Sequence, residues 1–165
     1  MTSEPTPLEA RARTAKLGPW QSRRGVLRWA RLIEREAAST GEAPLQVMRT
    51  HLSALDQKAG VAGGLAGFVG AIVAFVTPAV MAETEQTLAI ALLGFPVVAA
   101  VLAASYAVES LGFAADRDDA DIEIARLVRL AQRAANHAVS VRCLQVAAGA
   151  LGLLAGLYFG VLTPV

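Results

Sequence analysis

The chain has 165 residues, of which 55% are hydrophobic and only 18% are charged, and its formal net charge is +1. A soluble domain usually carries charge on about a quarter of its residues. The small net charge gives no reason to expect a nucleic-acid partner, and the single cysteine excludes an intramolecular disulfide and metal clusters that need several thiolates. The apolar residues are concentrated in three uncharged blocks, a distribution typical of a membrane protein.

The N-terminal part is polar and basic. Three prolines and one glycine interrupt residues 1–22, which are therefore predicted to be flexible. An amphipathic helix is expected over residues 23–40, and its basic face consists of Arg24, Arg28, Arg31 and Arg35. Such a helix either lies on the anionic inner leaflet of a membrane or packs against the cytosolic helices that continue the spans, with its arginines paired to the acidic cluster between Asp116 and Glu123. Both interpretations are open at this point.

Residues 44–163 are predicted to form a transmembrane helical domain. Its three spans cover about 59–81, 87–108 and 143–163, and about 20 helical residues are enough to cross a bilayer core. The first span is expected to begin as a cytosolic helix at Pro44, and the third to continue a cytosolic helix over about 118–142. The predicted fold class is all-α: an integral membrane helical protein with three transmembrane helices and cytosolic helical extensions.

The distribution of lysine and arginine predicts the orientation of the spans. Ten of these residues lie in 1–58 and the other five in 109–142. Because positively charged loops stay on the cytoplasmic side, both segments are expected inside and the C-terminus outside.

Small residues recur at steps of four in the spans. The second span has Ala99, Ala103 and Ala107, with Pro96 as an expected kink. Such stripes allow helices to approach closely in lipid, either within one chain or between subunits, and both interpretations are open. The candidate packing and oligomerisation residues in the first and third spans are Gly60, Gly63, Gly64, Gly67, Gly152, Gly156 and Gly160.

The sequence contains no phosphate-binding loop, dinucleotide fingerprint, zinc-protease motif or nucleophile elbow. The chain is therefore not expected to be an enzyme, and no cofactor or metal is predicted. The acidic run from Asp116 to Asp121 is interpreted as the solvated start of a helix, where negative charge suits the helix dipole, rather than as a metal site. His51 and His137 are interpreted as surface or packing histidines, with a pH-sensing role as the alternative.

Two charged residues stand immediately before the first span. Asp56 and Lys58 occur in the string Leu55–Gly60 (LDQKAG), and charges at this depth usually find a partner or reach the headgroups. This string, leading into a span rich in small residues, resembles the Asp-x-Lys-Ala motif of the Pycsar-type transmembrane effector family. The layout of residues 45–162 is similar to that family as well, whereas the motif itself covers residues 52–70.

The resemblance implies a role in bacterial anti-phage defence. In that family a cyclase makes a cyclic nucleotide on infection, and the effector then impairs the inner membrane. The function expected from this resemblance is a membrane effector that forms homo-oligomers and impairs membrane integrity in response to a cyclic-nucleotide signal, and the expected location is the bacterial inner (cell) membrane. The expected partners are the lipid bilayer, other copies of the chain, and a cyclic nucleotide or a partner protein. Only Asp56 and Lys58 carry over from the motif, so the ligand-binding residues are unknown. The alternative is a non-enzymatic structural or scaffold subunit that binds a partner through its cytosolic helices.

Overall fold

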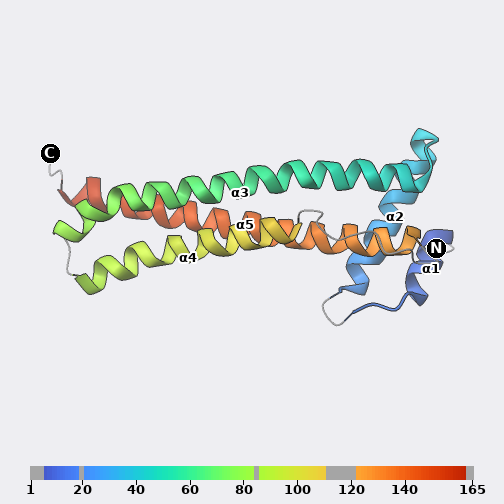
Figure 1. The fold of residues 1–165 in the computed structure, drawn as a ribbon, viewed down its shortest axis with the longest axis horizontal. Coiled ribbons are helices and arrows are strands. Elements are labelled where there is room, and N and C mark those ends of the chain that lie inside the picture. The colour runs from blue at the N-terminus through green and yellow to red at the C-terminus, as the bar shows by residue number, and fades with distance from the viewer. Residues whose placement is uncertain (1–5, 19–20, 84–85, 111–121, 163–165) are drawn as a thin grey trace. The chain divides into compact units, whose positions relative to one another are not determined.

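The computed structural model describes residues 6–18, 21–83, 86–110 and 122–162. These residues form five α-helices, shown in chain order in Figure 1: α1 (Pro7–Thr14), α2 (Arg23–Thr40), α3 (Pro44–Glu83), α4 (Gln86–Ser110) and α5 (Ile122–Leu162). The all-α fold class is therefore confirmed.

Three of the helices are long and apolar enough to cross a membrane. The candidate spans are Pro44–Ala82 in α3, Leu92–Glu109 in α4 and Ile122–Gly156 in α5. Backbone N–H and C=O groups cannot stay unpaired in lipid, and a helix pairs them within a single segment. Hydropathy alone therefore predicts these three helices. The protein is accordingly a multi-pass membrane protein by the length and composition of its helices.

Both predicted helix continuations are present in the structure, and the first residues predicted for the second one, 118–121, lie outside the described residues. α3 begins at Pro44 and runs without a break through the predicted first span, and α5 runs without a break from Ile122 to Leu162. Proline suits the first turn of a helix because its missing N–H would have no intrahelical acceptor there. Between α2 and α3, Gly41 adopts a φ of 72° and donates its N–H to the Ala37 carbonyl, so the turn occurs at a residue that tolerates left-handed backbone.

The chain divides into two compact units, which are described separately. The polar unit contains residues 1–57 and 110–136, and the apolar unit contains residues 58–109 and 137–165. The core of the polar unit joins α1, α2, the start of α3 and the start of α5. Its buried apolar residues are Leu8, Ala12, Val26, Ala30, Ile33, Ala37, Val47, Met48, Leu55, Ile124, Leu127, Leu130 and Ala131.

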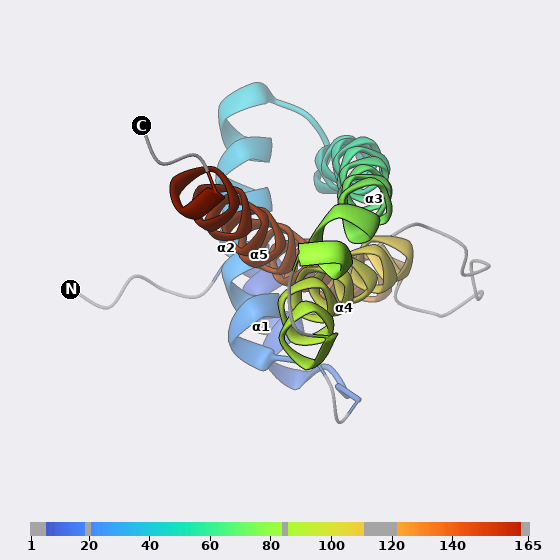
Figure 2. The ribbon, with the colours of Figure 1, turned by 90° about the vertical axis from the view of Figure 1, so that its left-hand side faces the viewer.

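In the apolar unit the three long helices lie side by side, as the end-on view in Figure 2 shows. Two small buried clusters hold them together: Val73, Val80, Leu93 and Leu154 in one, and Val69, Ala99, Ala100 and Ala147 in the other. Many large side chains on the outer faces stay exposed, including Phe75 at 86% and Leu153 at 73%. Exposed apolar surface of this extent is what a lipid-facing bundle presents.

The structure corrects the expectation that residues 1–22 are flexible throughout. α1 occupies Pro7–Thr14 within that segment and buries Leu8 and Ala12 in the polar core. Pro7 occupies the start of the helix, where proline is tolerated, so it begins the helix rather than preventing it.

Candidate functional site

The glycines of α3 and α5 face away from the rest of their own chain. A Cβ atom added to any of them would meet no atom within 4 Å among the described residues, apart from the helix's own nearby backbone. This holds for Gly60, Gly63, Gly64, Gly67, Gly152 and Gly156, whereas the surroundings of Gly160 lie outside the described residues. These glycines therefore do not pack the helices of one chain together.

Alanines occupy the internal contacts instead. On α4, Ala99, Ala103 and Ala107 are at most 7% exposed, and Ala147 on α5 is fully buried. On α3 the buried face begins with Ala59, Ala62 and Ala66. Ser140 of α5 reinforces this packing, because its buried hydroxyl donates a hydrogen bond of 2.8 Å to the Ala103 carbonyl on α4. Of the two kinds of small-residue stripe, the alanine stripes pack the spans and the glycine stripes remain open.

Asp56, from the motif before the first span, has a partner on another helix. Its Oδ1 accepts a hydrogen bond from Arg133 Nη1 at 3.4 Å, which joins α3 to α5 within the polar unit. The Arg133 side chain is only 9% exposed, while that of Asp56 is 46% exposed. The carboxylate thus supplies the countercharge that a largely buried guanidinium needs. Lys58 is exposed, and its role at the start of the span stays a prediction.

The basic helix α2 packs against other helices. Its apolar face, Val26, Ala30, Ile33 and Ala37, is buried in the core of the polar unit. Trp29 lies edge-on to the ring of His51, with the ring centroids 5.4 Å apart. The apolar face is therefore not free to insert into a leaflet in this fold. The acidic run Asp116–Asp121 lies outside the described residues, so the alternative in which it pairs with the arginines of α2 stays open.

A buried carboxylate that the sequence analysis did not single out fixes α1 to α2. The side chain of Glu9 is 6% exposed and its Oε1 accepts hydrogen bonds from Arg31 at 2.8 Å and Arg13 at 2.9 Å. These bonds, with Arg31 contributing most, lower the pKa of Glu9 from 4.5 to about 2. Nearby, Glu34 accepts the Leu8 backbone N–H at 2.6 Å, and burial raises the pKa of its carboxyl group.

The two carboxyl groups have opposite effects on stability as the pH changes. Because the pKa of Glu9 is lower in the folded state, its contribution is present above pH 4.5 and is lost as the pH falls to about 2. Protonation of Glu34, whose pKa is raised, favours the folded state, so its contribution is lost as the pH rises through that pKa.

We therefore expect Glu9→Gln to be less stable than the wild type at neutral pH, with the difference closing between pH 4.5 and about 2. Denaturant unfolding at several pH values, followed by Trp29 fluorescence, measures this difference. Glu42→Gln removes an exposed carboxylate and serves as the control. A difference that persists unchanged at pH 2 would contradict the assignment of the Glu9 ion pairs.

The two histidines differ in their surroundings. His51 Nε2 lies 2.7 Å from Glu36 Oε2, so this histidine joins α3 to α2, in agreement with a packing role. His137 Nδ1 is buried and has no hydrogen-bond partner among the described residues. No three histidine, cysteine, aspartate or glutamate side chains in the described part of the chain converge as ligands for a metal ion.

Comparison of the whole chain with protein-family models, with curated proteins and with solved structures finds no match. The assignment of a function therefore depends on the contacts, charges and exposed faces described above.

Proposed function

We propose that this chain is a non-enzymatic membrane effector that assembles with copies of itself through the glycine faces of α3 and α5 and thereby impairs the bilayer. The observation that supports the proposal is the openness of those faces: the six glycines named above have space for a side chain and meet none of the described residues closely enough to require glycine. Small residues on a span allow another helix to approach closely in lipid.

The cost of glycine in a helix supports a subunit contact over simple exposure to lipid. Each glycine costs about 1 kcal/mol relative to alanine in a helix interior, and α3 carries several within a few turns. A lipid-facing helix does not need them, since lipid adapts equally well to a larger apolar side chain. A neighbouring helix gains contact area only when the side chains between the two backbones are small.

The apolar unit also has a groove that a neighbouring chain could fill. It holds about 220 Å³ between α3 and α5 and is lined by Ile72, Phe75, Val76, Ala79, Val80, Leu151, Leu154 and Ala155. The lining is almost entirely apolar, so an apolar side chain from a second copy fits its chemistry.

The resemblance of Leu55–Gly60 to the Pycsar-type effectors supplies the biological context of the proposal. In that context the trigger is a cyclic nucleotide made during phage infection, and the polar unit lies in the bacterial cytoplasm with the C-terminus outside. The unbroken α3 and α5 each contribute residues to both units, so a change in the polar unit has a covalent route to the spans.

The proposal predicts that the double variant Gly152→Leu/Gly156→Leu abolishes membrane depolarisation. Bacteria would express the chain together with a nucleotide cyclase, and a potential-sensitive dye would report the membrane potential. Leucine at both positions keeps the helix apolar but prevents close approach of a second helix. The mass of the detergent-solubilised protein, measured by light scattering, should fall from that of an oligomer to that of a monomer.

The matched control is Gly94→Leu, because this glycine of α4 also has free space around it but belongs to neither glycine stripe. It should leave both the mass and the depolarisation unchanged. A wild-type monomer in mild detergent, or depolarisation by the double variant, would refute assembly through these faces. A correctly inserted chain that never depolarises cells and copurifies with a partner would favour the scaffold function instead.

A further inference from the structure

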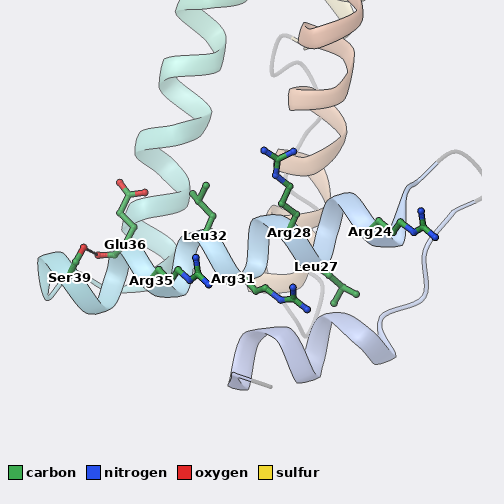
Figure 3. Close-up of a pocket in the computed structure, with 8 residues that line it drawn as sticks. All are labelled: Arg24, Leu27, Arg28, Arg31, Leu32, Arg35, Glu36 and Ser39. Carbon is green, nitrogen blue, oxygen red and sulfur yellow. Dashed lines mark hydrogen bonds between the residues drawn. The ribbon is translucent and has the colours of Figure 1, made fainter. Parts of the chain in front are cut away.

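The exposed face of α2 carries an open hollow of about 900 Å³, and among the described residues those that line it all belong to this helix (Figure 3). They are Arg24, Leu27, Arg28, Arg31, Leu32, Arg35, Glu36 and Ser39. The steps of three and four between the arginines place them on one side of the helix. Figure 3 shows the arginines spread along the helix rather than converging on a single point.

Most of this positive charge is not paired within the part of the chain that the structure describes. Arg31 binds Glu9, but Arg24, Arg28 and Arg35 form no ion pair within the described part of the chain. The acidic residue in the hollow, Glu36, already bonds to His51 at 2.7 Å. Like charges four residues apart, as in Arg24 and Arg28, weaken a helix rather than stabilise it.

We propose that this arginine face binds anions that carry several phosphate groups. The planar guanidinium donates two parallel hydrogen bonds to a phosphate, a geometry that lysine does not offer. From Arg24 to Arg35 the face extends about 16 Å along the helix axis, so it can hold several phosphates in a row. Leu27 and Leu32 also line the hollow, so apolar side chains border the arginines.

Two sources supply this chemistry: a soluble polyphosphate and a row of anionic lipid headgroups. Because the apolar face of α2 is buried in the polar unit, either ligand would reach the helix only through its arginines. The proposal does not depend on assembly through the glycine faces, since all the residues concerned belong to the polar unit.

The test uses the full chain in uncharged detergent. Calorimetric titration with tripolyphosphate measures the soluble source, and native mass spectrometry after addition of phosphatidylglycerol counts retained lipids. The double variant Arg28→Gln/Arg35→Gln removes two arginines that form no ion pair with the described residues, and it leaves the Arg31–Glu9 bond intact. The charge-matched control is Lys16→Gln/Arg49→Gln, which removes two exposed charges outside the hollow. Helix content by circular dichroism verifies that both variants are folded.

The arginine variant should lose about tenfold or more in affinity for whichever probe binds, and the control about twofold or less. If the arginine variant binds tripolyphosphate more weakly, the ligand is a soluble polyphosphate. If it only retains less phosphatidylglycerol, the ligand is a row of lipid headgroups. Binding should also weaken as ionic strength rises. Failure of the wild type to bind either probe, or equal losses in the arginine variant and the control, would overturn the proposal. If the oligomer mass is unchanged in both variants, the loss of anion binding does not come from a failure of assembly.

Discussion

Replacing Ile33 with alanine is expected to lower the free energy of unfolding of the polar unit by about 3 kcal/mol. Ile33 is fully buried on the inner face of α2, in the cluster that also contains Met48 of α3 and Leu127 of α5. Removing the outer carbons of Ile33 loses the free energy gained by transferring them from water to the core. It also leaves a cavity that the neighbouring helices fill only in part. A small domain has a total stability of about 5–15 kcal/mol, so this loss is a large fraction of the whole.

Trp29 provides the measurement, since it lies in the polar unit against His51. Denaturant unfolding in mild detergent, in a Trp20→Phe background, would follow its fluorescence. The adjacent Leu32→Ala is the matched control, because Leu32 is 39% exposed and a comparable number of carbons is removed. We expect this control to cost about 1 kcal/mol or less. Equal losses from the two variants would mean that α2 does not bury the face described above.

The long helices could be predicted from the sequence because the bilayer imposes a simple rule. An uncharged block of about 20 residues that must satisfy its own backbone hydrogen bonds has one common solution, a helix. The start of α3 at Pro44 and the break at Gly41 were predictable for a similar reason, since proline and glycine act through local backbone geometry. These features depend on short-range chemistry that a single sequence carries in full.

The partners of each helix face could not be predicted in the same way. The steps of four in Ala99, Ala103 and Ala107 and in Gly152 and Gly156 look alike in sequence, yet the alanines are buried and the glycines are open. Hydropathy does not separate them, because both faces are apolar and lipid is as apolar as a neighbouring helix. Only the positions of the other helices decide which stripe lies inside the chain.

Long-range polar contacts could not be predicted from the sequence either. The sequence marked Asp56 as a charge that needs a partner, but it did not identify Arg133, which lies 77 residues away. α1 was missed because a segment of eight residues is too short to be a stable helix by its own propensity. Contacts with other parts of the polar unit, including the Glu9–Arg31 pair, hold it in place. Such contacts leave no periodic signal in the chain.

The alanine packing of the apolar unit leads to a second large expected effect. Replacing Ser140 with leucine should destabilise that unit by about 3 kcal/mol, at the upper end of the range for overpacked cores. Ser140 and Ala103 are both fully buried, and the hydroxyl oxygen lies only 2.8 Å from the Ala103 carbonyl oxygen. A leucine side chain has no room at this contact, so α4 and α5 must separate or the side chain must adopt a strained rotamer.

Ser140→Ala distinguishes steric contact from hydrogen bonding at this position. Alanine fits the same space and loses only the hydrogen bond, which between membrane helices contributes about 0.6 kcal/mol on average. The thermal unfolding midpoint of the full chain in detergent should therefore fall clearly for leucine and little for alanine. If alanine is as damaging as leucine, the hydrogen bond rather than close packing holds α4 against α5. If leucine is tolerated, the alanine face of α4 is not in tight contact at Ala103, and the distinction between closed alanine faces and open glycine faces is lost.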